Sequence, residues 1–266
     1  MTPSQIVERA LEEDIGSGDV TTNLCVPADR LATGRFLVRD PIVVAGTELL
    51  PLLYDDIDLK APSGTCLQAG KEIATVRGPA QKLLTRERVA LNFLQHLSGI
   101  ATEARKYVDA VAGTGCRILD TRKTIPGLRE LEKMAVRAGG ATNHRMGLFD
   151  AVLIKNNHIT AAGGVRAALE ATRNAKVPIQ IEVRTRTELE EALDCGAKRL
   201  LFDNLSPSEA KDWIRYIAGR ATVELSGGIT IDTVRAYAET GADFISVGAI
   251  THSARAVDIH FHLELE

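Results

Sequence analysis

The chain has 266 residues, of which 45% are hydrophobic, 25% charged and 4% aromatic, and its formal net charge is −3. These fractions are typical of a folded globular protein and exclude a disordered or fibrous chain. No apolar run reaches the ~20 residues that a membrane-spanning helix needs, and the first residues lack the pattern of a signal peptide. The four cysteines are scattered, without metal-ligand spacing, as expected of reduced thiols. We therefore expect a cytoplasmic protein without a membrane partner.

The charge is unevenly distributed along the chain. Between Arg122 and His158, seven Lys or Arg residues face three Asp or Glu residues, which gives this segment a net charge of +4 and the remainder −7. A basic segment inside an acidic protein favours a small anionic ligand over a polymer.

The first hundred residues predict a small mixed α/β domain. Thr2-Pro3 suits a helix start, with Thr as the cap and Pro in the first turn. From about 35 to 76, short apolar runs divided by Pro and Gly predict β-strands. A helix over about 80–97 follows, which we expect Ser98-Gly99 to end, and then a second helix over about 102–111.

From residue 116 onward, strand-like and helical segments alternate. The predicted strands cover 116–120, 151–155, 179–183, 199–203, 222–226 and 244–247, and the helices between them include 187–195, 206–218 and 232–240. This alternation indicates parallel strands joined by right-handed crossovers. We expect an α/β fold with an incomplete parallel barrel of six to seven strands. The predicted domains are an N-terminal domain over 1–105, on which the tail from about 255 to 266 packs back, and a barrel over 106–254.

Polar residues or glycines follow the predicted strands, where the loops of a parallel barrel converge to form the active site. They are Asp120 with Arg122 and Lys123, then Lys155, Glu182, Asp203, Ser226-Gly227-Gly228 and Gly248. The glycines could let backbone N–H groups approach a phosphate, or could simply form turns. The two carboxylates Glu182 and Asp203 could act as an acid–base pair, bind sugar hydroxyls or hold magnesium.

Other charged residues have an ordinary interpretation beside the functional one. No HxH or HExxH spacing supports metal ligation by His144 or His158, so hydrogen bonding or contact with an anion is favoured. Arg88, in a charged helical run, would by default be solvated or ion-paired. A nucleic-acid-binding protein is the alternative from another class, but no aromatic residues interleave with the basic segment.

Eight motifs in order carry a family resemblance: ALEEDIGSGDVTT (10–22), RERVALNFLQHLSGIAT (86–102), DTRKTIPGLRELEKMAV (120–136), GGATNHRMGLFDAVLIKNNHI (139–159), IEV (181–183), FDN (202–204), SGGIT (226–230) and FISVGAITHSA (244–254). Together they resemble the quinolinate phosphoribosyltransferases, also called nicotinate-nucleotide pyrophosphorylases (carboxylating). The resemblance implies transfer of phosphoribosyl from phosphoribosyl pyrophosphate to quinolinate with decarboxylation, in de novo NAD biosynthesis. It also implies magnesium as cofactor, and a homodimer, or a higher oligomer, with active sites at the interface. Paralogues associated with molybdenum transport share much of the pattern, and a different base is the alternative substrate.

The resemblance also implies roles for individual residues. Substrate carboxylates and neighbouring phosphates would face Arg122, His144, Arg145 and Lys155, with Arg88 supplied by the partner subunit. Lys123 would serve the phosphoribosyl phosphates, and Glu182 and Asp203 the ribose hydroxyls or magnesium. The 5′-phosphate would lie against Ser226, Gly227, Gly228 and Gly248. The catalytic residues would be Lys123, Lys155, Glu182 and Asp203.

The sequence departs from the family pattern at a few positions. Asn156 replaces the usual acidic residue after Lys155, Phe202 replaces a leucine, and the acidic alternation of the third strand becomes Gln180-Glu182-Arg184. Because Glu182 keeps its position 21 residues before Asp203, we retain its predicted role.

Overall fold

The structure is a computed structural model that describes residues 1–265. The chain forms two compact units, each described separately below. The first unit contains Met1–Arg105, Thr124–Gly140 and the chain from Ile250 onward, and the second contains Lys106–Lys123 and Ala141–Ala249. The segment Thr124–Gly140, which lies within the sequence range predicted for the barrel, thus belongs to the first unit.

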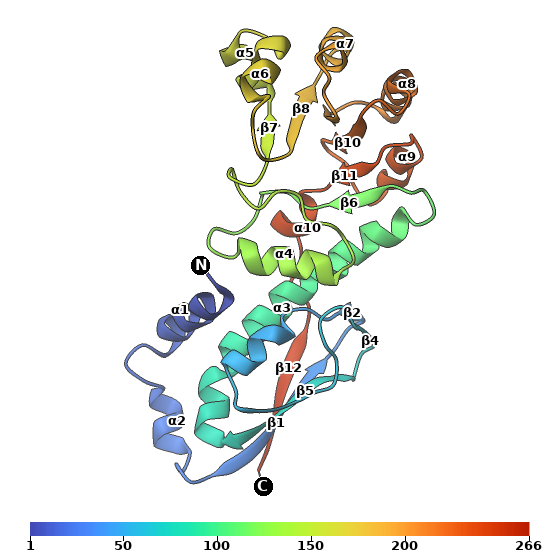
Figure 1. Ribbon diagram of the computed structural model, residues 1–266. Coiled ribbons are helices and arrows are strands. Elements are labelled where there is room, and N and C mark those ends of the chain that lie inside the picture. The colour runs from blue at the N-terminus through green and yellow to red at the C-terminus, as the bar shows by residue number, and fades with distance from the viewer. Residues whose placement is uncertain (266) are drawn as a thin grey trace. The chain divides into compact units, whose positions relative to one another are not determined.

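The first unit is built on an antiparallel sheet with the strand order β12-β1-β5-β3. These strands are β1 (Leu31–Val38), β3 (Asp56–Leu59), β5 (Glu72–Pro79) and β12 (Ile259–Leu265), and a separate pair joins β2 (Ile42–Val43) to β4 (Cys66–Leu67). Although β1 and β12 are more than 200 residues apart in the chain, they are paired from Ala32↔Leu265 to Val38↔Ile259, as Figure 1 shows. The helices that lie wholly in this unit are α1 (Pro3–Ile15), α2 (Val20–Cys25), η1 (Thr47–Leu52) and α4 (Arg129–Ala138). The long helix α3 (Ala80–Ala110) belongs to it up to Arg105, and α10 (Ala249–His252) from Ile250 onward.

The N-terminal helix begins where the sequence predicts. Thr2 is the N-cap of α1, and its hydroxyl accepts a hydrogen bond from the Gln5 backbone N–H while the Gln5 side chain accepts one from the Thr2 N–H. This capping box satisfies two of the N–H groups that a helix start leaves without partners. The prediction from Thr2-Pro3 is confirmed.

The long helix α3 (Ala80–Ala110) corrects the predicted break at Ser98-Gly99, because it runs through both residues without interruption. A Cβ atom at Gly99 would lie 2.1 Å from the Arg255 carbonyl oxygen, and the hydroxyl of Ser98 bonds to the backbone of Ala45. Ser98 and Gly99 therefore serve the close packing of α3 within the first unit, and neither ends the helix.

The second unit contains a parallel six-stranded sheet with the order β6-β11-β10-β9-β8-β7. Its strands are β6 (Arg117–Leu119), β7 (Val152–Ile154), β8 (Ile179–Val183), β9 (Arg199–Asp203), β10 (Thr222–Ser226) and β11 (Phe244–Ser246). The crossovers from β7 to β11 carry the helices α5 (Asn156–Ala162), α6 (Val165–Thr172), α7 (Arg186–Asp194), α8 (Pro207–Ile217) and α9 (Val234–Ala238) (Figure 1). The connection from β6 to β7 contains α4, which belongs to the first unit. The edge strands are β6 and β7, and Thr142 adds one parallel bridge beside Leu119 on β6. This is the incomplete α/β barrel that the sequence predicts.

The strand register explains why polar side chains gather on one face of this sheet. Successive side chains of a strand point to opposite faces, so paired residues and residues two apart share a face. Leu201 pairs with both Glu182 and Glu224, and Asp203 pairs with Ser226. The alternate residues Ile181, Val183, Leu200, Phe202, Val223, Leu225 and Ile245 are buried hydrophobics. The polar face, called here the inward face, carries the residues predicted for the site.

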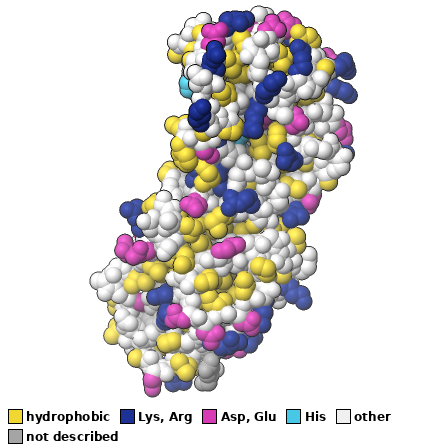
Figure 2. All heavy atoms as spheres, viewed as in Figure 1, with side chains coloured by type: hydrophobic (Ala, Val, Ile, Leu, Met, Phe, Trp, Pro, Cys, Tyr) yellow, Lys and Arg dark blue, Asp and Glu magenta, His cyan; other side chains and the backbone are white. Residues whose placement is uncertain are grey.

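The surface view agrees with the balanced charge of the chain. Figure 2 shows Lys and Arg side chains interspersed with Asp and Glu on the viewed face. Among the described residues, no helix is both long and apolar enough to cross a membrane.

Candidate functional site

Four of the predicted site residues lie at or just after the carboxyl ends of neighbouring strands of the second unit, three on the central strands β8, β9 and β10 and one after the edge strand β7. Glu182 lies near the end of β8, Asp203 ends β9 and Ser226 ends β10. Lys155 directly follows β7, two residues after Leu153, which pairs with Gln180. The carboxyl ends of parallel strands lie at the same end of a barrel, so the sheet brings these side chains to one region.

The segment from Thr142 to Ala151 carries His144 and Arg145, and two carboxylates hold its backbone. Asp120, fully buried, accepts hydrogen bonds from the His144 backbone N–H at 2.7 Å and from Asn143 Nδ2 at 2.6 Å. Asp150 accepts from the backbone N–H groups of Met146 and Gly147 at 2.7 and 3.0 Å. The conformation of this segment is thus set by side chains on either side of His144 and Arg145.

The guanidinium of Arg145 is held in a partly buried and positively charged environment. Its Nη1 donates a hydrogen bond to the Ala151 carbonyl oxygen at 3.0 Å. Burial and, second, the nearby charge of Arg122 lower the pKa of Arg145, while Asp150 acts in the opposite direction. Arg122 follows β6 by three residues, so the fold brings these two predicted ligands of an anion together.

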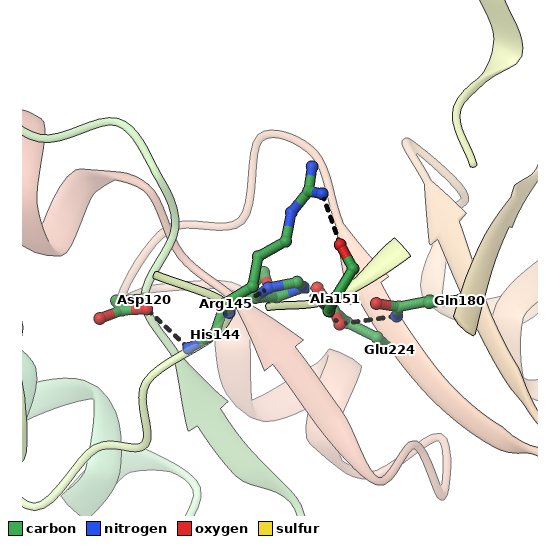
Figure 3. A network of polar contacts seen from close by, with 7 residues as sticks. Asp120, His144, Arg145, Ala151, Gln180 and Glu224 are labelled. Carbon is green, nitrogen blue, oxygen red and sulfur yellow. Dashed lines mark hydrogen bonds and ion pairs between the residues drawn. The ribbon is translucent and has the colours of Figure 1, made fainter. Parts of the chain in front are cut away.

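His144 contacts a buried carboxylate on the inward face. Its Nε2 lies 3.3 Å from Oε2 of Glu224, a residue of β10 that is 4% exposed. The same carboxylate accepts a hydrogen bond from Gln180 Nε2 at 2.8 Å and another from the Ser246 hydroxyl. Figure 3 shows this network, which joins the His144 segment to three strands.

A cavity of about 560 Å³ lies beside this network. Its size is in the range of sites that hold small molecules. Its lining residues include His144, Arg145, Gln180 and Glu224, together with residues that begin the strands, such as Arg117, Arg199, Thr222 and Phe244. Two of the residues predicted to contact substrate, His144 and Arg145, therefore line this cavity, which lies toward the amino ends of the strands. Lys155, Glu182, Asp203 and Ser226, at the carboxyl ends, are not among its lining residues.

The two predicted carboxylates differ in their surroundings. Glu182 is 6% exposed, and within residues 1–265 its carboxylate makes no hydrogen bond or ion pair. Asp203 accepts a hydrogen bond from Asn204 Nδ2 at 2.8 Å. Within residues 1–265, no three or more His, Cys, Asp or Glu side chains form a cluster suited to a metal ion. Two carboxylates on adjacent strands nevertheless suit Mg²⁺, which usually takes one or two carboxylates together with substrate phosphates.

The two glycines after β10 adopt left-handed backbone conformations that favour glycine. Gly227 has φ +101°, and a Cβ there would lie 2.2 Å from Asn204 Oδ1. The Asn204 backbone N–H also donates to the Ser226 carbonyl oxygen at 2.8 Å. Gly228 has φ +60° with open space where a side chain would be. Close packing against Asn204 thus explains why residue 227 is a glycine. The backbone at Gly228 remains open to contact by a ligand.

The remaining predicted residues lie at other places. Lys123 is exposed, and its backbone N–H donates to the Thr121 hydroxyl. Gly248, partly buried, precedes α10. Arg88 is exposed on α3 in the first unit. His158, exposed, accepts a hydrogen bond from the Lys155 backbone N–H at 2.9 Å and caps the start of α5.

The prediction from sequence missed Glu224 and gave no role to Gln180 or Asp150. A signal for Glu224 was present, because strand alternation places it on the same face as Ser226, two residues later. Its partner Gln180 is 44 residues away in the chain, and no local pattern links the two.

Comparisons with known proteins cover nearly the whole chain. Sequence models of the quinolinate phosphoribosyl transferase N-terminal and C-terminal domains match residues 19–98 and 100–262. The nicotinate-nucleotide pyrophosphorylase [carboxylating] of Mycobacterium leprae is 41% identical over 271 residues, which cover 97% of this chain and 95% of that protein. A probable nicotinate-nucleotide pyrophosphorylase [carboxylating] of Bacillus subtilis is 39% identical, covering 95% of this chain and 90% of its own. The crystal structure of NadC from Streptococcus pyogenes superposes with a TM-score of 0.95 at 36% identity, covering 100% of this chain and 99% of the other.

Proposed function

The chain belongs to the quinolinate phosphoribosyltransferase family, and on this premise we propose that the inward face of its second unit binds the substrates. The enzyme is a pentosyltransferase of de novo NAD biosynthesis. It transfers the phosphoribosyl group of phosphoribosyl pyrophosphate to quinolinate and releases pyrophosphate and CO₂, which leaves nicotinate mononucleotide. The alternative of a paralogue acting on another base is not favoured, because both domain models carry the quinolinate name.

Quinolinate is a dianion, and basic residues suit its two carboxylates. We assign Arg122, His144, Arg145 and Lys155 to this substrate. The place of His144 and Arg145 on the cavity wall is the observation that carries the assignment, and the positive charge of Arg122, which lowers the pKa of Arg145, adds to it. Each guanidinium presents a planar fork that matches the two oxygens of a carboxylate.

The phosphoribosyl group would lie toward the ends of β8, β9 and β10. Glu182 and Asp203 would bind the ribose hydroxyls or hold magnesium with the diphosphate, and Lys123 would contact the phosphates. The 5′-phosphate would lie against Ser226, Gly227, Gly228 and Gly248, since late loops of barrels are the usual place for phosphate. Magnesium, when bound, would neutralise charge on the departing pyrophosphate.

The chemistry requires charge stabilisation and no covalent intermediate on the enzyme. The quinolinate nitrogen forms a bond to the ribose anomeric carbon, and the bond to pyrophosphate breaks with its electron pair leaving on oxygen. Carboxylates Glu182 and Asp203 would stabilise the oxocarbenium-like transition state. When CO₂ departs, its bonding pair remains on the ring carbon beside the pyridinium nitrogen until a proton replaces it. The fixed cations Lys155 and Lys123 would stabilise charge in these steps, which is why we consider them catalytic.

Two further proposals concern assembly and location. We expect a homodimer, or a higher oligomer, in which exposed Arg88 of one subunit reaches the site of the other. We also expect a cytoplasmic enzyme, since the free thiols of Cys25 and Cys66 are exposed, and such thiols persist in a reducing compartment.

One assay tests the function directly. Purified protein incubated with quinolinate, phosphoribosyl pyrophosphate and magnesium should yield nicotinate mononucleotide and CO₂ in equal amounts. Addition of EDTA should stop the reaction and excess magnesium should restore it. No product over a range of pH values and divalent metals would contradict the function, and undiminished turnover in EDTA would contradict the magnesium requirement.

A further inference from the structure

The carboxylate of Glu224 is enclosed by hydrogen-bond donors on the inward face. Oε2 faces both His144 Nε2 at 3.3 Å and Gln180 Nε2 at 2.8 Å, and Oε1 accepts from the Ser246 hydroxyl. The donors come from β8, β11 and the segment before β7. Figure 3 shows Glu224, His144 and Gln180 converging from separate parts of the second unit.

The second ring nitrogen of His144 fixes where the imidazole proton resides. The backbone N–H of Arg145 lies 2.7 Å from His144 Nδ1. A backbone amide can only donate, so Nδ1 must supply its lone pair and the proton is on Nε2. That Nε2–H points at Glu224. The ring is therefore held at both nitrogens, with its Nε2–H directed at Glu224.

Glu224 remains ionised in this setting. Burial by itself raises its pKa, but the hydrogen bond from His144, the charge that His144 carries when protonated, and the hydrogen bonds from Gln180 and Ser246 outweigh that effect, so the pKa lies below its ordinary value. An ionised acceptor makes stronger hydrogen bonds than a neutral one. The carboxylate can thus orient the imidazole firmly.

Glu224 is a buried charged residue inside strand β10. Its neighbours Val223 and Leu225 are buried hydrophobics of the opposite face. A buried charge contributes little net stability compared with a well-packed apolar residue, because its desolvation offsets the gain. A carboxylate at this position is better explained by the side chain that it orients than by the stability of the sheet.

We propose that Glu224 is a positioning residue of the enzyme, which fixes the tautomer and orientation of His144 and, through His144 Nδ1, the backbone at Arg145. The chain of contacts runs from Glu224 to the His144 ring, to the Arg145 amide, and ends where the Arg145 guanidinium donates to Ala151 O. The proposal rests on the assignment of His144 and Arg145 to quinolinate. Its expected effect is therefore on quinolinate binding more than on phosphoribosyl pyrophosphate.

Two substitutions separate the hydrogen bonds of Glu224 from its volume. In Glu224→Gln, the amide oxygen can accept from His144 and Gln180, and the Ser246 hydroxyl can turn to accept from the amide nitrogen. In Glu224→Leu, the space is filled but the three donors His144, Gln180 and Ser246 lose their acceptor. We expect Glu224→Leu to raise KM for quinolinate about 10- to 100-fold, the range for losing a charge-assisted hydrogen bond. The KM for phosphoribosyl pyrophosphate should change less than about twofold, and Glu224→Gln should recover most of the loss, as a conservative replacement does for a positioning role.

Exposed Glu190 supplies the matched control, because Glu190→Gln removes a surface carboxylate that pairs only with Arg186 among the described residues. This variant should match the unmodified enzyme in both KM values. Equal rises in the two KM values of Glu224→Leu, or an unchanged quinolinate KM, would overturn the proposal.

A spectroscopic measurement keeps the proposal testable even if Glu224→Leu does not fold. Imidazole ¹⁵N chemical shifts of His144 in the unmodified enzyme should report the Nε2–H tautomer, and Glu224→Gln should preserve it. An Nδ1–H tautomer in the unmodified enzyme would refute the arrangement. A wrong assignment of His144 to quinolinate would give a different result. In that case His144→Ala would leave the KM for quinolinate unchanged, while the unmodified enzyme would still show the Nε2–H tautomer.

Discussion

Arg122 lies close enough to Arg145 that its charge contributes, after burial, to lowering the pKa of the Arg145 guanidinium. The two residues are 23 positions apart and come from segments on either side of Thr124–Gly140, which folds into the first unit. Bringing two guanidinium groups together costs free energy that a bound dianion can repay. The fold therefore brings the charge of Arg122 to bear on Arg145, a residue of the cavity wall, before substrate arrives.

Arg145→Ala should depress kcat/KM for quinolinate by about 10- to 150-fold, because it removes a charged hydrogen bond worth roughly 1.5–3 kcal/mol. Arg145→Lys should recover only part of the loss, since an ammonium lacks the planar fork. Steady-state kinetics with each substrate varied in turn would measure both effects. The exposed Arg215 offers a control, and Arg215→Gln should leave the kinetics unchanged. Near-normal activity of Arg145→Ala would refute the assignment to quinolinate.

Cys116 should make stability fall at alkaline pH. Burial raises the pKa of its thiol to about 12, from an ordinary value of 9.0. Below pH 9 the thiol is protonated in both folded and unfolded chains; between pH 9 and about 12 only the unfolded chain releases the proton, so unfolding becomes more favourable. Urea unfolding at pH 8 and pH 10 should show a smaller loss of stability for Cys116→Ala than for the unmodified protein. Identical losses in the two proteins would contradict the prediction.

The two glycines of the turn after β10, Gly227 and Gly228, should differ in how much an alanine substitution destabilises the protein. Gly227→Ala should lower the free energy of unfolding by roughly 2–5 kcal/mol, because left-handed strain adds to the clash with Asn204. Gly228→Ala, with open space around its Cβ, should cost only about 1–2 kcal/mol. Denaturant unfolding of both variants would test the order. If the Gly228 backbone contacts phosphate, Gly228→Ala should also raise KM for phosphoribosyl pyrophosphate.

The strands of the second unit could be predicted closely because their apolar alternation is a local signal. The predicted ranges 179–183, 199–203 and 222–226 coincide with β8, β9 and β10. Side chains at the strand ends could be found for the same reason, since Lys155, Glu182 and Asp203 stand out against buried neighbours. The predictions that failed concern residues whose role depends on partners far away in the sequence. Gly99 has the local appearance of a helix end, and only its contact with Arg255 shows otherwise.

The same limit applies within the candidate site. The role proposed for Glu224 follows from Gln180, Ser246 and His144, none of which is near it in the chain. A carboxylate inside a short strand also fits a solvent-facing position until the register of the neighbouring strands is known. Strand pairing is what converts the alternation of polar residues into a shared inward face.

Mixing two inactive variants should test whether subunits share an active site. If Arg88 acts across a dimer interface, a hybrid of Arg88→Ala and Lys155→Ala subunits has one site with both residues intact and one with neither. Random exchange between equal amounts makes half of the dimers hybrids, so activity should recover toward about one quarter of the unmodified enzyme.

The matched control mixes Lys155→Ala with Arg145→Ala, whose positions lie in the same second unit. Every site in those hybrids lacks one residue, and no recovery is expected. Exchange of subunits would be verified with two differently tagged chains by co-purification. Once exchange is verified, a mixture of Arg88→Ala and Lys155→Ala that stays inactive would place Arg88 outside a shared site, because each hybrid would otherwise contain one complete set of residues.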